Sequence, residues 1–117
     1  MNKKPFFSII IPTYNQSVFL EKAIKSVLLQ KKNYEMIIID NNSTDDTKKI
    51  VTKYERSNLK YLKINNAGII GKSRNLGIKN AIAPWIAFLD SDDIWHKDKL
   101  SLIENFIKNN TEYDVIT

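Results

Sequence analysis

The sequence contains no cysteine, three glycines, three prolines and one histidine. Without cysteine the chain can form neither a disulfide bond nor a thiolate metal site, so a bound metal would need oxygen ligands or His96. This absence is compatible with a cytoplasmic location, which we expect. No apolar run approaches the roughly 20 residues that cross a bilayer as a helix. The lysines near the start run directly into a short β-like segment instead of an apolar signal core, so we expect no secretion signal there.

The composition is typical of one soluble globular domain. The 117 residues are 43% hydrophobic and 26% charged, and a chain of this length can bury most of its apolar side chains in one core. The net charge of +5 comes from 18 Lys and Arg against 13 Asp and Glu. Such a charge suits nucleic acid, anionic lipid or phosphorylated ligands. The lysines are scattered pairs without an arginine-rich stripe, so we expect mostly solvated surface and no nucleic-acid partner.

Short β-branched runs alternate with segments of helical spacing, which indicates βαβ units around a mostly parallel sheet flanked by helices. Strands are predicted over residues 6–12, 35–40, 59–64, 85–89 and 113–117. One helix is predicted after an N-cap at Ser17, a second after a capping box formed by Ser43 and Asp46, and two more over 72–81 and 97–109. In the last helix, four residues are expected to face inward: Leu100, Ile103, Phe106 and Ile107. The fold class is therefore α/β and Rossmann-like, and we expect a truncation at 117, inside the fifth strand.

The unusual polar residues follow three of these strands. In an open parallel sheet, ligands bind beyond the carboxyl ends of the strands, near the point where the strand order reverses. Those ends carry Pro12-Thr13-Tyr14-Asn15, Asp40-Asn41-Asn42-Ser43 and Asp90-Ser91-Asp92-Asp93. We therefore expect the three segments to meet at one edge of the sheet.

The last segment places three carboxylates, those of Asp90, Asp92 and Asp93, within four residues. They repel one another unless a cation or hydrogen-bond donors compensate. Mg²⁺ and Mn²⁺ prefer oxygen ligands and often bind one or two protein carboxylates together with phosphate oxygens. The group therefore indicates a divalent metal and a diphosphate, unless its members only cap the next helix. His96 is an alternative ligand or base, and Trp95 is expected in the core or in a pocket wall.

Four further residues fit a nucleotide. Asp40 can accept hydrogen bonds from a base or ribose, and Tyr14 offers an aromatic face for stacking. Lys72 and Arg74 lie in the first turn of the predicted third helix, where cations and free amides can meet phosphate. Each also has a plain structural explanation: a turn for Asp40, loop packing for Tyr14 and solvated charge for the two cations.

Four motifs occur in a fixed order along nearly the whole chain: SIIIPTYN at 8–15, IIIDNNSTDDT at 37–47, SRNLGI at 73–78 and IAFLDSDDIW at 86–95. As an ordered set, they resemble the inverting, GT-A-fold glycosyltransferases of family 2. Two departures are small, since Asn41 stands where many members have aspartate and the loop over 66–74 is about one residue longer than the commonest spacing. The set is specific for the family and poorly specific for the substrate.

The resemblance implies a nucleotide-diphosphate-sugar donor, with a UDP-sugar as the first candidate, and a Mn²⁺ or Mg²⁺ ion that bridges the donor phosphates. It assigns Asp92 and Asp90 to the metal. Its donor-binding residues are Pro12, Thr13, Tyr14, Asn15, Asp40, Asn41, Lys72, Arg74, Asp90 and Ser91.

The implied reaction transfers a sugar by single displacement to an acceptor hydroxyl, in polysaccharide or glycoconjugate synthesis. Residues 1–117 would form the donor-binding portion, whereas the general base and the acceptor-binding portion would lie beyond Thr117, so the fragment alone is expected to be inactive. The acceptor would be a saccharide or a lipid-linked molecule, and a lipid-linked acceptor would place the whole enzyme peripherally at the inner face of the membrane. The alternative function is a nucleotide-binding module without transferase activity.

Overall fold

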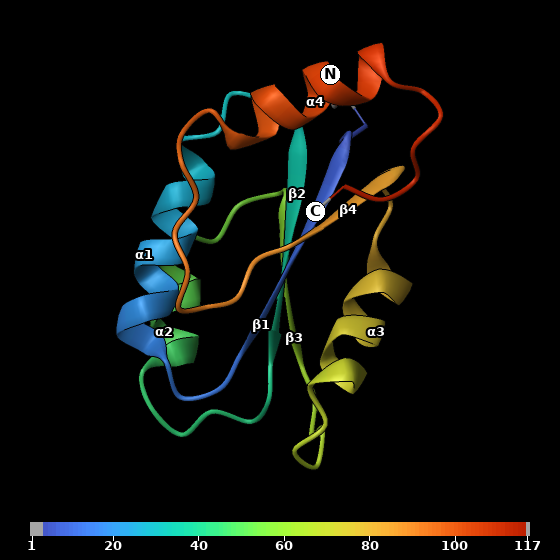
Figure 1. Cartoon of the computed structure of the whole chain (residues 1–117). Helices are drawn as coiled ribbons and strands as arrows, with labels where there is room; N and C mark the ends of the chain where they lie inside the picture. Colours follow the sequence, from blue (N-terminus) through green and yellow to red (C-terminus); the bar gives the residue numbers. More distant parts are fainter. Residues whose placement is uncertain (1–3, 117) are drawn as a thin grey trace.

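The computed structural model describes residues 4–116, in which strands and helices alternate along the chain (Figure 1). The strands are β1 (Phe7–Thr13), β2 (Tyr34–Asp40), β3 (Leu59–Lys63) and β4 (Trp85–Phe88). The helices are α1 (Ser17–Leu28), α2 (Thr47–Lys53), α3 (Ile70–Asn80) and α4 (Lys99–Asn109). The predicted parallel α/β fold is confirmed. No helix of this described part is long and apolar enough to cross a membrane.

The four strands form one parallel sheet in the order β3-β2-β1-β4. The chain moves outward from β1 to β3 and then returns to place β4 on the other side of β1. This reversal creates a switch point between the carboxyl ends of β1 and β4, where open α/β sheets bind ligands. The register pairs Thr13 with Asp40, so the ends of β1 and β2 also lie side by side.

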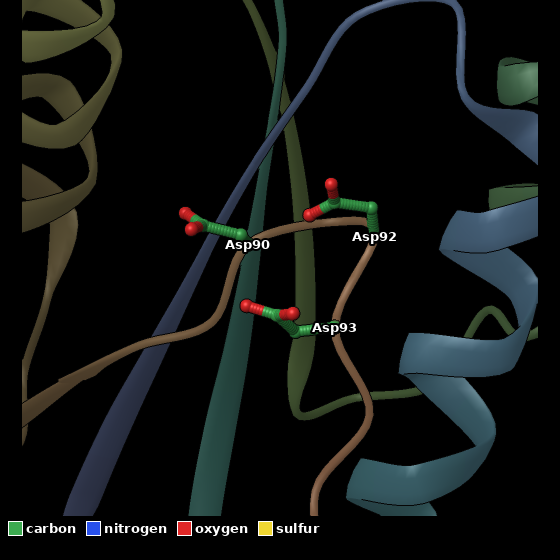
Figure 2. A group of neighbouring side chains, drawn as sticks. All are labelled: Asp90, Asp92 and Asp93. Carbon is green, nitrogen blue, oxygen red and sulfur yellow. The ribbon is translucent and has the colours of Figure 1, made fainter.

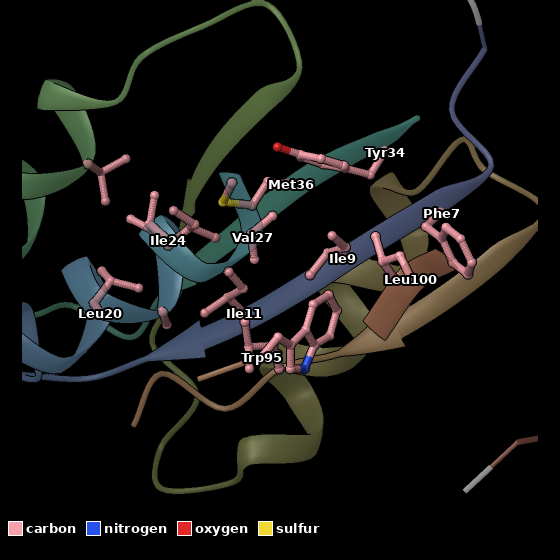
Figure 3. Packing of buried hydrophobic residues seen from close by; sticks show 14 residues of the cluster. Phe7, Ile9, Ile11, Leu20, Ile24, Val27, Tyr34, Met36, Trp95 and Leu100 are labelled. Atoms are coloured by element: carbon pink, nitrogen blue, oxygen red, sulfur yellow. The ribbon is translucent and has the colours of Figure 1, made fainter. Parts of the chain in front are cut away.

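Both faces of the sheet are buried, which explains why its central strands read as uninterrupted apolar runs. Helices α1 and α2 cover one face and α3 covers the other, while α4 lies across the end where the strands begin (Figure 1). Ile9 and Ile11 face the larger core, shared with α1, α2 and α4 (Figure 3). Ile10 points the opposite way, into a smaller cluster that includes Leu76 of α3.

A buried carboxylate, that of Glu35, links β1, β2 and β3 near the end of the sheet where the strands begin. Glu35 Oε2 accepts hydrogen bonds from the Ser8 hydroxyl at 2.5 Å and the Ile82 amide at 2.7 Å. Lys60 Nζ on β3 lies 3.0 Å from Glu35 Oε1. Burial alone would raise the pKa of Glu35, but these donors and the lysine outweigh it and leave the pKa lowered.

Both predicted helix caps are wrong, because a distant loop bonds the start of α1 and a different nearby residue bonds the start of α2. Ser17 is the first residue of α1 and not its N-cap, which is Gln16, and the Ser17 amide donates to Asp45 Oδ2 at 3.0 Å. The capping box does not form either: Asp46 occupies the N-cap of α2 without a side-chain cap bond. Asp45 Oδ1 accepts the Thr47 amide at 3.0 Å instead.

The starts of the other two helices differ from prediction by two residues, since α3 begins at Ile70 and α4 at Lys99. Phe106 was expected to face inward but is 42% exposed. Glu104 is buried on that helix instead, where Lys32 Nζ lies 2.7 Å from its Oε2. Residues 113–116 form no strand, and Thr117 lies outside the described residues. The centres of the Tyr113 and Phe106 rings are 5.8 Å apart, so Tyr113 packs against α4 and its backbone forms no strand.

Candidate functional site

A pocket of about 420 Å³ lies at the switch point, a volume typical of ligand-binding clefts. Its wall includes eight of the predicted residues: Pro12, Thr13, Tyr14, Asn41, Arg74, Asp90, Ser91 and Asp92. Five further residues complete it: Gln16, Asn66, Gly68, Ile70 and Ser73. Asn15, Asp40 and Lys72 do not line it. The predicted meeting of the three polar segments at one edge is therefore confirmed, although not every residue of those segments faces the pocket.

The acidic turn after β4 gathers three carboxylates (Figure 2). Oxygen atoms of Asp90, Asp92 and Asp93 all lie within 4.8 Å of one another, and all three residues are exposed. The Asp93 amide donates to the Asp90 carbonyl at 3.0 Å and closes the turn. Oxygen ligands at this spacing suit Mg²⁺ or Mn²⁺. Asp93, which was not among the predicted metal ligands, stands beside the two that were.

Arg74 places a permanent cation next to this turn. Its Nη2 atom lies 3.3 Å from Asp90 Oδ1, and its guanidinium lies 5.8 Å from the centre of the Phe88 ring. The Arg74 Nε atom is buried and has no hydrogen-bond partner among residues 4–116. Arg74 lies in the second turn of α3, not in the first as predicted. Lys72 lies in the first turn and is exposed.

The hydroxyl of Thr13 is the second unpaired polar group in the pocket wall. Thr13 ends β1 and is 5% exposed, yet its Oγ1 atom has no hydrogen-bond partner in the part of the chain that the structure describes. A buried polar atom without a partner costs about 1–3 kcal/mol. The hydroxyl is therefore available to a polar ligand in the pocket, whose mouth also carries the exposed ring of Tyr14.

Asp40 lies behind the pocket wall. It is almost fully buried at the end of β2, where Oδ1 accepts the Ser43 amide at 3.0 Å and Oδ2 accepts the Tyr61 hydroxyl. Burial, and then the neighbouring Asp40 carboxylate, raise the pKa of Tyr61 well above its ordinary value. These two bonds fix the β2–α2 turn.

Asn15 joins two of the loops at this edge. Its backbone has a positive φ of 48°, which asparagine tolerates better than most residues. Its side-chain oxygen accepts the amides of Thr44 at 2.7 Å and Asp45 at 3.3 Å, and its own amide donates to Ser43 Oγ at 2.9 Å. The side-chain carbonyl of Asn15, a predicted donor-binding residue, thus holds the β1–α1 loop against the β2–α2 loop.

Four of the five pocket residues that sequence reasoning missed come from the β3–α3 loop and from α3. Asn66 is buried, its amide donates to Asn41 Oδ1 at 2.9 Å, and its side chain donates to Ser73 Oγ at 3.0 Å. Gly68 has a φ of +80°, the left-handed region that favours glycine. The run Asn65-Asn66-Ala67-Gly68 has the composition of a tight turn, so applying the strand-end argument to the third strand would have found this loop.

His96 and Trp95 lie apart from the pocket. The His96 side chain is 73% exposed, and its Nδ1 accepts the Asp98 amide at 3.2 Å. Among the described residues it belongs to no metal-binding group, so the structure does not place it with the acidic turn. Trp95 is 7% exposed in the larger core, as predicted (Figure 3).

Comparison with known proteins adds three findings. The family profile of Glycosyl transferase family 2 matches residues 8–117. The putative teichuronic acid biosynthesis glycosyltransferase TuaG of Bacillus subtilis is 42% identical over 104 residues, which cover 85% of this chain and 40% of TuaG. The crystal structure of S. aureus TarS 1–349 in complex with UDP has a TM-score of 0.84 at 35% identity, over 90% of this chain and 32% of that one.

A more distant structure shows the fold alone. The mannosyltransferase PcManGT from Pyrobaculum calidifontis, solved with GDP-Man and Mn²⁺, has a TM-score of 0.82 at 20% identity over 93% of this chain and 34% of that one. These structural neighbours are GT-A glycosyltransferases, so the predicted GT-A fold is confirmed. The chain spans less than half of the length of each protein compared.

Proposed function

Because the chain belongs to glycosyl transferase family 2, as its motifs predict, we propose that it is the donor-binding portion of an inverting, metal-dependent glycosyltransferase. The donor is a nucleotide-diphosphate-sugar, and the acceptor hydroxyl belongs to a growing polysaccharide or glycoconjugate. One observation carries the proposal. At the switch point of the sheet, a single pocket combines the acidic turn, a guanidinium and a buried hydroxyl without a partner.

The nucleoside is proposed to occupy the part of the pocket between the β1 and β2 ends. The Tyr14 ring stacks on the base, and the Thr13 hydroxyl gains the partner that it lacks. Asp40, which is buried behind the pocket wall, is proposed to act on the nucleoside indirectly, by fixing the β2–α2 turn through its bonds to Ser43 and Tyr61. UDP is the first candidate nucleotide, since TarS, at 35% identity, was crystallised with it.

The diphosphate is proposed to lie between Arg74 and the acidic turn. Asp92 and Asp90 hold Mg²⁺ or Mn²⁺, with Asp93 close enough to assist. The ion would neutralise the negative charge that grows on the departing diphosphate. Arg74 faces the same charge, and its unpartnered Nε gives the guanidinium a free donor for a phosphate oxygen. Lys72, two residues earlier in α3, supplies a second, more exposed cation.

We assign the remaining catalytic groups to the part of the related proteins that this chain does not span. That part would supply the general base for the acceptor hydroxyl and the acceptor site itself. We propose a cytoplasmic enzyme with a saccharide or lipid-linked acceptor, and the lipid-linked case places it at the inner face of the membrane.

Calorimetric titration tests the donor site. UDP, and separately GDP, are titrated into the chain with Mn²⁺ and again with EDTA. We expect one nucleotide to bind only with Mn²⁺, and Asp92→Ala to weaken that binding at least about tenfold, because it removes a charged metal ligand. Asp98→Ala is the matched control: it removes the same charge from the same loop, and Asp98 lies outside the acidic group.

Two results would contradict the proposal. Equal nucleotide affinity with and without the Asp92 carboxylate would refute the metal assignment. If neither nucleotide binds a chain that circular dichroism shows to be folded, the donor-site proposal fails for this chain.

A further inference from the structure

Ser91, which lies between Asp90 and Asp92 in the acidic turn, is anchored by a residue at the start of α1. Ser91 is 3% exposed, whereas Asp90 and Asp92 on either side are exposed. The Ser91 hydroxyl donates a hydrogen bond to Oε1 of Gln16, at the start of α1. Asp90, Ser91 and Asp92 all line the pocket, and the bond to Gln16 ties the turn to the start of α1 at the residue between the two carboxylates.

Gln16 occupies an unusual position for its residue type. It is the N-cap of α1, where short polar residues that bond the helix amides are preferred, but its side chain makes no cap bond. Its backbone carbonyl accepts the Leu20 amide at 2.7 Å and opens the helix. Asp45 of the neighbouring loop bonds the first helix amide, that of Ser17, in its place. The Gln16 side chain is thereby free to reach across to Ser91.

The base of this contact is firmly held. Asn15 and Ser17, the neighbours of Gln16 in sequence, are both hydrogen-bonded to the β2–α2 loop. A side chain that projects from a backbone fixed on both sides has few alternative positions. Gln16 can therefore transmit the placement of the β1 and β2 ends to the turn that follows β4.

We propose that Gln16 is a positioning residue for the metal-binding turn. Through the Ser91 hydroxyl, it holds Asp90 and Asp92 at the separation that a divalent cation requires. This inference rests on the proposed function, because it assigns a role in metal binding to a contact between two residues of the pocket wall.

The same loop has a second anchor on α1 that serves as a control. Ser26 Oγ, which lies three turns further along α1, accepts the Trp95 amide at 3.1 Å. That contact secures the loop inside the larger core, away from the carboxylates. Its loss should lower stability without changing the spacing of Asp90 and Asp92.

The test measures Mn²⁺ affinity by electron paramagnetic resonance, with UDP and separately with GDP present. The variants are Gln16→Ala, Ser91→Ala, the double variant and Ser26→Ala. We expect Gln16→Ala and Ser91→Ala each to weaken Mn²⁺ binding about tenfold, because each removes one hydrogen bond that holds the turn. The double variant should be no weaker than either single one, because both remove the same contact. Ser26→Ala should lower the unfolding midpoint and leave Mn²⁺ affinity unchanged.

A second measurement needs no ligand. Hydrogen exchange of the Asp93 amide, which closes the turn, should be at least about fivefold faster in Gln16→Ala and Ser91→Ala than in the wild-type chain. Wild-type Mn²⁺ affinity in Gln16→Ala, or fully additive losses in the double variant, would overturn the inference while leaving the donor site intact. A wild-type chain that binds no Mn²⁺ with either nucleotide overturns the proposed function and, with it, the metal role of Gln16. Faster Asp93 exchange in the variants would then support only the structural contact.

Discussion

Replacing Gly77 with alanine should destabilise the fold by about 1–2 kcal/mol, although alanine is the better helix former. A Cβ at this position of α3 would lie 2.6 Å from Cγ2 of Ile10 and 3.1 Å from its Cγ1 and Cδ1. Carbon atoms in contact are about 3.5–4.0 Å apart, so α3 must shift or Ile10 must leave its rotamer. Overpacking of this kind costs about 1–3 kcal/mol, and helix propensity returns at most about 1 kcal/mol.

Urea unfolding followed by circular dichroism measures this effect. Gly71→Ala is the matched control in the same helix, because a Cβ there meets nothing within 4 Å; it should be neutral or stabilising by up to about 1 kcal/mol. Ile10→Ala alone should cost roughly 2–5 kcal/mol through the cavity it leaves. Combined with Gly77→Ala, the total loss should fall short of the sum by about 1–2 kcal/mol, since each change relieves the other. A Gly77→Ala chain as stable as the wild type would refute the steric argument.

Three further predictions concern hydrogen-bonded polar groups and use the same unfolding assay. Glu35→Gln should lower stability at pH 7 by about 2–4 kcal/mol, because several donors lose a charged acceptor. Folding lowers the pKa of Glu35 below 4.5, so the stabilisation by its carboxylate is complete above that pH and is lost as the pH falls through the folded pKa. The variant should therefore lose less stability than the wild type on acidification. Parallel profiles of stability against pH would contradict this. Asn15→Ala should cost about 1–2 kcal/mol, and Asn15→Asp, which keeps the acceptor for Thr44, should cost less. Tyr61→Phe should cost about 1–3 kcal/mol by leaving Asp40 with one partner fewer, and unchanged stability would count against that bond.

The strands and helices could be predicted because their signals are local. The runs around Ile10 and Ile38 are apolar throughout, as expected for strands covered on both faces, and their bounds agree with prediction to within a residue or two. The same reasoning failed for Phe106, because helical spacing does not tell which of two neighbouring faces finds a partner. Here Lys32 pairs with Glu104 and turns that side inward. The choice depends on a residue more than 70 positions away.

The site was predictable to the extent that topology alone determines it. Parallel strands place their carboxyl ends at one edge, so Thr13, Asn41 and Asp90 could be brought together from the sequence. The order of the strands could not be read in this way. The β3–α3 loop with Asn66 was missed because the strand-end argument was not applied to the third strand. Helix capping failed for a related reason: the group that bonds the Ser17 amide is 28 positions away.

Residues within the family motifs do two different kinds of work. Thr13 and Asp92 line the pocket, and the Thr13 hydroxyl has no hydrogen-bond partner among the described residues. The side chain of Asn15 is instead engaged with the β2–α2 loop, and that of Ser91, although it is also in the pocket wall, is bonded to Gln16. A motif match cannot distinguish ligand-facing residues from loop-fixing ones, because both roles use the same short polar side chains at the strand ends. Substitution should separate them. Loss of a pocket-facing group should weaken nucleotide binding at nearly unchanged stability, whereas loss of a loop-fixing group should lower stability, and affinity only through the geometry that the loops impose.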